Sequence, residues 1–130
     1  MIDRYARPKM KRVWSEENKY DKWLAIEIAV CTAWAEMDVI PKKDMIKLRN
    51  ATYNIERLDE IFKLTKHDMT AFTRSITENL GEEGRWIHLG LTSSDVIDTA
   101  QSLQMVEAIT LLIKGVDALR KILKTRAMEF

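Results

Sequence analysis

The sequence predicts an all-α protein, and three observations support this fold class. Apolar residues recur at helical spacing along most of the 130 residues. The turn signals of proline and glycine fall mainly between those apolar stretches. The last segment carries a long heptad repeat of apolar residues. We therefore expect an N-terminal helical domain over residues 1–93, followed from residue 94 to residue 130 by the start of a helical-bundle domain.

The composition is that of a soluble domain with a modest core, at 46% hydrophobic and 32% charged residues. Twenty-one basic and twenty acidic side chains give a net charge of +1, so no overall field favours nucleic acid or an anionic membrane. The N-terminus lacks the apolar stretch of a signal peptide, and the run "LAIEIAVCTAWAEM" is too short and too broken by glutamate to span a bilayer. We expect a cytoplasmic protein without nucleic-acid or membrane partners.

The first long helix is predicted from a cap at Ser15 to Met37. Two glutamates follow the cap, where the helix dipole favours negative charge. Apolar side chains then recur at helical spacing at Tyr20, Trp23, Leu24, Ile28, Cys31 and Ala35. Pro41 ends the pattern. Cys31 is the only cysteine, so the chain forms no internal disulfide, and its place in the apolar stripe predicts a buried, inert thiol.

Shorter helices are predicted in the middle of the chain, over 44–50 and over 55–64 with Asn54 as the cap. A further helix follows "KHDM", and its residues Met69, Phe72, Ile76 and Leu80 share one face. Gly81 and Gly84 are expected to end it. The stretch "RWIHLGLT" is expected to form a turn or a short extended piece.

The last helix is predicted to be longer than the domain that carries it. Its apolar seam alternates steps of four and three residues through Met105, Ile109, Leu112, Val116, Leu119 and Leu123. Such a helix extends roughly 50 Å, whereas a compact globule of this chain length is about 36 Å across. The seam then needs partner helices from other copies of the chain or from further sequence. A break into two helices near Gly115 is the alternative.

The stretch "HLGLTSSDVIDTA" places many small polar groups at the start of this helix. Ser93 or Ser94 can cap it. Gly90 permits a close backbone approach, and Thr92 and Ser93 can add hydroxyl donors to the free amides of a helix N-terminus, which bind anions. The negative charges of two aspartates in the same stretch partly disfavour the binding of an anion. Both a plain capped helix start and a turn that binds carboxylate or phosphate therefore fit the residues.

Each histidine and the basic N-terminus also have two interpretations. His67, between Lys66 and Asp68, can transfer protons or can be an exposed turn residue. His88 lies in an apolar stretch, where a core or turn histidine is the commoner outcome. Arg4 and Tyr5 belong either to a solvated basic tail or to a phosphate-binding pair. Two histidines are too few for a histidine-rich metal site, and no metal site is predicted.

Three motifs together resemble the adenylosuccinate lyase family of the fumarase/aspartase superfamily. They are "RYARPKM", "KHDMTAF" and "HLGLTSSDVIDTA", in the family's order and spacing over residues 4–100. The resemblance implies that the last helix is the first helix of a central bundle. It also implies a lyase of purine nucleotide biosynthesis, which eliminates fumarate from adenylosuccinate to give AMP and from SAICAR to give AICAR. No metal and no organic cofactor is implied.

The resemblance assigns roles to residues at the matching positions. Arg4, Tyr5 and His88 would contact the nucleotide at its phosphate, Lys66, His67 and Asp68 would line the same pocket, and Thr92 and Ser93 would hold the succinyl carboxylate. His67 would be an assisting catalytic residue. In the family, the general-acid histidine lies in a "GRTHxxHAEP" segment and the base is a serine in an "SSxMPxKxNP" loop.

Neither of those segments occurs in these 130 residues. The family forms homotetramers whose sites combine three subunits, so we expect a homo-oligomer and a chain without turnover alone. A helical self-association module without catalysis is the alternative function.

Overall fold

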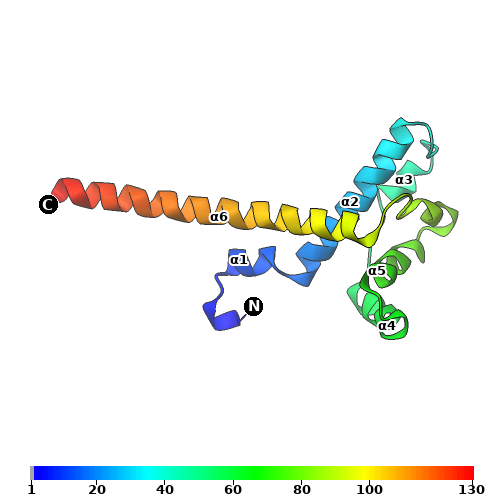
Figure 1. The fold of residues 1–130 in the computed structure, drawn as a ribbon, viewed down its shortest axis with the longest axis horizontal. Coiled ribbons are helices and arrows are strands. Elements are labelled where there is room, and N and C mark those ends of the chain that lie inside the picture. Colours follow the sequence, from blue (N-terminus) through cyan, green and yellow to red (C-terminus); the bar gives the residue numbers. More distant parts are fainter. Residues whose placement is uncertain (1) are drawn as a thin grey trace.

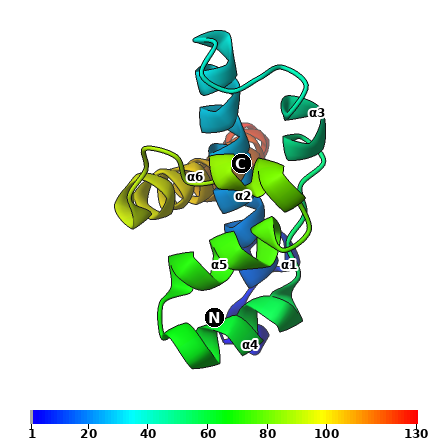
Figure 2. The ribbon, with the colours of Figure 1, turned by 90° about the vertical axis from the view of Figure 1, so that its right-hand side faces the viewer.

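The computed structural model describes residues 2–130 and confirms the all-α fold class, because every regular element of the described residues is a helix. In chain order these are η1 (Asp3–Tyr5), α1 (Pro8–Val13), α2 (Glu16–Glu36), α3 (Met45–Leu48), α4 (Ile55–Thr65), α5 (Asp68–Thr77), η2 (Gly81–Trp86) and α6 (Ser93–Glu129), where η denotes a 3-10 helix. The shorter helices gather around α2 at one end of the molecule, and α6 projects far beyond them (Figures 1 and 2).

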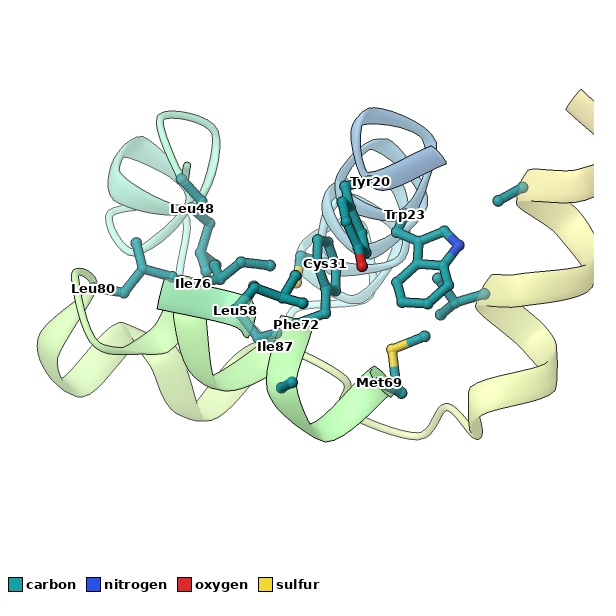
Figure 3. Close-up of a cluster of buried hydrophobic side chains, with 14 of the residues drawn as sticks. Tyr20, Trp23, Cys31, Leu48, Leu58, Met69, Phe72, Ile76, Leu80 and Ile87 are labelled. Carbon is teal, nitrogen blue, oxygen red and sulfur yellow. The ribbon is translucent and has the colours of Figure 1, made fainter. Parts of the chain in front are cut away.

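The core lies between α2 and α5. The predicted apolar stripe of α2 faces the core, and its residues Tyr20, Trp23 and Cys31 are buried (Figure 3). Phe72 of α5 is fully buried, stacks on Tyr20 with ring centroids 5.7 Å apart and meets the edge of Trp23 at 5.2 Å. Aromatic pairs of this geometry add to the stabilisation from buried apolar area. Phe72 therefore joins the two helices that carry the rest of the fold.

Helices α4 and α5 form an adjacent pair joined by a tight turn. Lys66 ends α4 in the left-handed conformation, with φ at +52°. At the other end of the pair, the Arg57 guanidinium donates two hydrogen bonds of 2.8 Å to the Glu78 carboxylate. This exposed ion pair contributes little to stability, so the buried Leu58 and Ile61 of α4 provide most of the contact with the core.

The first part of α6 packs against α1 and α2 through small and polar residues. Ala100 and Ala108 are buried, and the Gln104 amide donates a 2.7 Å hydrogen bond to the carbonyl of Val13 at the end of α1. The Glu107 carboxylate accepts hydrogen bonds from Asn18 and Lys22 of α2. The hydrogen bond from Lys22, followed by that from Asn18, holds the pKa of Glu107 below its ordinary value of 4.5.

This lowered pKa predicts a contribution to stability that depends on pH. A carboxyl group with a depressed pKa stabilises the fold above its ordinary pKa, and the stabilisation is lost as the pH falls from about 4.5 through the folded value. Because the side chain is 39% exposed, we expect Glu107→Gln to cost about 0.5–1 kcal/mol at pH 7 and less at acid pH. Urea unfolding at several pH values measures this difference. Glu129→Gln, at the far end of α6, is the control, and an equal loss in both variants contradicts the prediction.

Most of the predicted elements are confirmed, with differences at their ends. The Ser15 side chain caps α2 by accepting from the Asn18 amide, as predicted. Helix α1 was not predicted. The expectation that α5 ends at Gly81 and Gly84 was wrong, because α5 ends at Thr77 and both glycines belong to η2. The amides of residues 78–80 satisfy carbonyl groups at the end of α5, and η2 begins only after them.

The single long helix is confirmed, and it runs unbroken through Gly115. At about 1.5 Å per residue the 37 residues of α6 extend about 55 Å. Its seam residues Met105, Ile109, Leu112, Val116, Leu119 and Leu123 are between 46% and 65% exposed in the single chain. The division of the chain into domains at residues 93 and 94 stays a prediction.

Helix α6 is also long and apolar enough to cross a membrane, judged by length and composition alone. An 18-residue window in it has a mean hydropathy of 1.3, and 22% of that window is buried. This segment is distinct from the shorter apolar run in α2. A bundle helix with a heptad seam meets the same criteria, so the finding is weak evidence for a membrane. The cytoplasmic location and the absence of a membrane partner stay predictions.

Candidate functional site

The predicted site residues lie in three segments at or just before the start of a helix. Arg4 and Tyr5 are in η1, residues 66–68 end α4 and begin α5, and residues 88–93 lead into the first residue of α6. In the last two turns the free amides of a helix N-terminus are at hand, and these groups favour anions.

His88 is held by a buried carboxylate of α2. Glu27 is fully buried, and its Oε2 accepts a 2.8 Å hydrogen bond from the His88 amide. Its Oε1 lies 2.6 Å from the His88 Nδ1. The donor and the acceptor in this contact depend on the tautomer of the ring; an ionised Glu27 only accepts, and opposite such a carboxylate Nδ1 is the protonated ring nitrogen. The His88 side chain is 25% exposed, so Nε2 is the ring nitrogen left for another partner.

Two residues of the turn that contains His88 have left-handed backbone conformations, and side chains of α2 contact the turn at both. His88 has φ at +67° and Gly90 has φ at +76°. A Cβ atom at Gly90 would lie 3.3 Å from the Trp34 ring, and the Trp34 indole donates to the Leu89 carbonyl at 3.1 Å. Both the backbone conformation and the space beside Trp34 therefore favour glycine at position 90.

Cys31 lies on the same face of α2 as Glu27. Its thiol donates a 3.5 Å hydrogen bond to the Trp86 carbonyl. Burial, and then the nearby charge of Glu27, raises the pKa of the Cys31 thiol to about 11. A thiol with this pKa is protonated at neutral pH and is a poor nucleophile. The position is thus buried as predicted, and the raised pKa agrees with the inert thiol that the sequence analysis expected.

The start of α6 is capped one residue earlier than predicted. Thr92, and neither Ser93 nor Ser94, is the N-cap residue. Thr92 forms a capping box with Asp95, whose Oδ2 accepts a 2.8 Å hydrogen bond from the Thr92 amide. The chain turns from extended to helical geometry at Thr92, where φ is −112° and ψ is 165°. Ser93 is therefore the first residue of the helix and half-buried, close to the free amides.

His67 caps α5 with its ring. The Nδ1 atom accepts a 3.2 Å hydrogen bond from the Thr70 amide, and the side chain is 54% exposed. An accepting Nδ1 bears no proton, so the neutral ring carries its proton on Nε2. With Glu27 ionised, the two histidines of the chain have opposite tautomers. The interpretation of His67 as a mere exposed turn residue omitted this capping role.

Lys66 and Asp68 flank His67 on the surface. Lys66 is exposed at the left-handed residue that ends α4. The Asp68 Oδ1 accepts a 2.7 Å hydrogen bond from the Met69 amide and lies 3.8 Å from the His67 Nδ1. Both side chains remain accessible to a ligand at this turn.

Arg4 and Tyr5 form a pair at the N-terminus. The Arg4 guanidinium lies 4.7 Å from the centre of the Tyr5 ring, and the Tyr5 side chain is largely exposed. A guanidinium over an aromatic ring keeps its hydrogen-bond donors free at the edge. The pair is therefore oriented and available for an anion.

Helices α5 and α6 begin at the same core. Met69 and Val96, which closely follow the turns of His67 and Thr92, belong to one buried cluster. The hydrogen bonds of His67 and Thr92 stay within their own turns, and those of His88 run to α2. A hollow of about 570 Å³ between α2 and residues 52–56 contains none of the predicted site residues. Within residues 2–130, no group of three or more metal-ligating side chains is present.

Glu27 is the residue that the sequence analysis missed. It was not counted among the residues of the apolar stripe, although it lies four residues after Trp23 and four before Cys31. A charged residue at a stripe position is seldom buried without a partner. That spacing was a usable signal for a buried polar contact, but it does not identify His88 as the partner, because the contact spans 61 positions.

Comparisons with known proteins agree over nearly the whole chain. A family model described as lyase matches residues 3–130. The adenylosuccinate lyases of Bacillus subtilis (strain 168) and of Streptococcus mutans serotype c are each 48% identical over 130 residues. Each match covers 99% of this chain, which spans about 30% of the length of those relatives.

A solved structure has the same fold. The crystal structure of fumarate lyase from Mesorhizobium sp. BNC1 aligns with a TM-score of 0.80 over 89% of this chain and 28% of that chain. At 24% sequence identity, this likeness concerns the fold alone.

Proposed function

The chain belongs to the lyase family, and on that premise we propose that it forms part of the active site of an adenylosuccinate lyase. The observation that carries the proposal is the 48% identity to two curated adenylosuccinate lyases over 99% of the chain. The reaction would be the elimination of fumarate from adenylosuccinate, with release of AMP, and from SAICAR, with release of AICAR.

Such an elimination breaks a carbon–nitrogen bond and needs three kinds of group. A base removes the proton beside a carboxylate, an acid protonates the departing nitrogen, and hydrogen-bond donors stabilise the negative charge that develops on the carboxylate-bearing carbon. The chain offers amide and hydroxyl donors at the start of α6 and an oriented imidazole at each of two turns. These groups suit substrate binding and assistance to proton transfer.

The assignment of residues to the substrate is the one that the resemblance implies, and the chemistry of these residues supports it. Arg4, with Tyr5, and His88 would bind the phosphate of the nucleotide, because guanidinium and imidazolium groups donate charge-assisted hydrogen bonds. Thr92 and Ser93 would hold the succinyl carboxylate at the start of α6, where hydroxyl and amide donors lie together.

The α4–α5 turn would contribute His67 as an assisting catalytic residue. With Nδ1 engaged by the Thr70 amide, its Nε2–H is the group available to a substrate atom. Lys66 and Asp68 would border the same pocket and adjust its charge. Both are exposed beside His67, which supports this placement.

The chain is expected to lack turnover alone. The general-acid histidine and the base serine implied by the resemblance have no counterpart in these residues. We propose that both come from sequence beyond the 130 residues and that the complete site forms in a cytoplasmic homotetramer. The exposed seam of α6 supports assembly with further helices.

Binding of AMP to the 130-residue chain tests the phosphate assignment. We expect Arg4→Ala to weaken binding at least about tenfold, because a charge-assisted hydrogen bond is worth roughly 1.5–3 kcal/mol. Arg120→Ala is the control, since Arg120 lies in the projecting part of α6 and pairs with Asp117. Isothermal titration gives both affinities. Equal affinities of the two variants for AMP would contradict the assignment.

The α6 seam favours self-association without catalysis as the second candidate function. Six seam residues are about half-exposed, which is unusual for a soluble monomer. A module of this kind would associate through the seam and use the polar turns only as helix caps. Substitutions at His67 would then change stability by a cap contribution of about 1 kcal/mol and affect no reaction.

A further inference from the structure

We propose that Glu27 is a positioning residue, which holds His88 with Nδ1–H directed at the protein and leaves Nε2 as the nitrogen for a phosphate monoester. The ligand class rests on the proposed function, whereas the orientation of the ring rests on the structure alone.

Glu27 directs both of its oxygens at one residue. One accepts from the His88 amide at 2.8 Å and the other lies 2.6 Å from the His88 Nδ1. The first contact fixes the backbone of the turn and the second fixes the ring. A carboxylate that only accepts requires a donor at each contact, so the pair specifies a protonated Nδ1.

Burial of the Glu27 carboxylate is unfavourable unless both of its hydrogen bonds to His88 form. Glu27 is fully buried between Trp23 and Cys31 on the inner stripe of α2, where a carboxylate without partners is strongly unfavourable. His88 has φ at +67°, which is uncommon for a residue other than glycine. The buried carboxylate of Glu27 therefore contacts a residue whose own backbone is strained. Strained backbone is typical of functional positions.

The consequence for a ligand concerns a single atom. With Nδ1–H committed to Glu27, Nε2 is the nitrogen that can take up or release a proton. When Nε2 is protonated, the ring offers a charge-assisted hydrogen bond to a phosphate oxygen, and the carboxylate of Glu27 balances the charge of the ring from inside the protein. A phosphate monoester would therefore bind without leaving a buried charge unpaired.

The tautomers of the two histidines test the positioning role directly. In long-range 1H–15N NMR spectra of the 130-residue chain, we expect the His88 Nδ1 to remain protonated across the whole pH titration. The His67 Nδ1 should lack a proton at high pH and serves as the internal reference, because it accepts the Thr70 amide. A His88 Nδ1 that lacks a proton at high pH would overturn the proposal.

Glu27→Gln is the matched variant, because it keeps the shape of the side chain. The glutamine oxygen can still accept from the His88 amide, but its amide group would donate to Nδ1. We expect the neutral His88 ring to shift its proton to Nε2 while the His67 signals stay unchanged, which shows that the fold is intact. A His88 ring that keeps its proton on Nδ1 in this variant would overturn the role of Glu27.

Titration with AMP supplies the functional part of the test. We expect Glu27→Gln to weaken AMP binding about tenfold, because a glutamine amide that donates to Nδ1 keeps the ring neutral and removes the charge from its hydrogen bond to the phosphate. Glu36→Gln, at an exposed position of α2, should leave the binding unchanged. Unchanged affinity in Glu27→Gln would overturn the link to the phosphate. If the wild-type chain binds no AMP, the claim that its own residues form a phosphate site is contradicted, and the NMR result alone decides whether Glu27 positions His88.

Discussion

His67→Ala is expected to lower fumarate formation by about 10²–10⁴-fold in a hybrid enzyme, the loss typical of a removed acid–base group. In this hybrid the chain replaces the matching segment of Bacillus subtilis adenylosuccinate lyase, to which it is 48% identical. The same substitution removes the ring nitrogen that caps α5. It should therefore also cost about 1 kcal/mol in the free energy of unfolding.

His67→Asn separates the two effects. Asparagine is among the best N-cap residues, so this variant should retain the cap and the stability of α5. It offers no group that titrates near neutral pH, and fumarate formation should fall as it does in His67→Ala. Steady-state rates and urea unfolding curves measure both quantities. Normal turnover in His67→Asn would contradict a proton-transfer role and leave His67 a capping residue.

Phe72→Ala is expected to lower the free energy of unfolding by about 3–5 kcal/mol. Phe72 is fully buried and lies in ring contact with Tyr20, Trp23 and Tyr53. The truncation leaves a cavity at the junction of α2 and α5 that this rigid cluster cannot readily fill. Because domains are stable by only about 5–15 kcal/mol, the variant should be largely unfolded at moderate urea concentrations.

Phe62→Ala provides the control for aromatic truncation. Phe62 lies on α4 and is 42% exposed, so its loss should cost well under the value expected for Phe72. Circular dichroism during urea unfolding gives both free energies. Similar losses in the free energy of unfolding for the two variants would contradict the central place of Phe72 in the core.

Long amphipathic helices could be predicted because their apolar spacing is repeated many times. Helix α2 begins behind the Ser15 cap as expected, and α6 follows its heptads through Gly115. Helix α1 has only six residues, too few for a periodic signal, and Pro8 at its first position was the one available cue. Its stability depends on tertiary contacts such as that from Gln104.

The candidate site was less predictable than the fold because its key contacts are distant in sequence. The motifs at His67 and Thr92 identified the turns, but several residues near each turn could act as the cap. The choice of Thr92 depends on where the chain leaves the His88 turn, and α2 determines that geometry through Glu27 and Trp34. Pairings of this kind arise only when the helices pack.

The rate of fumarate formation by the unmodified hybrid tests the proposed lyase function most directly. We expect the assembled hybrid to release fumarate from adenylosuccinate, because this chain would supply the binding residues and the Bacillus subtilis segment the remaining groups. The chain alone should release none. A soluble hybrid that sedimentation shows to be assembled, but that forms no fumarate, would contradict the assignment of this chain to an adenylosuccinate lyase site.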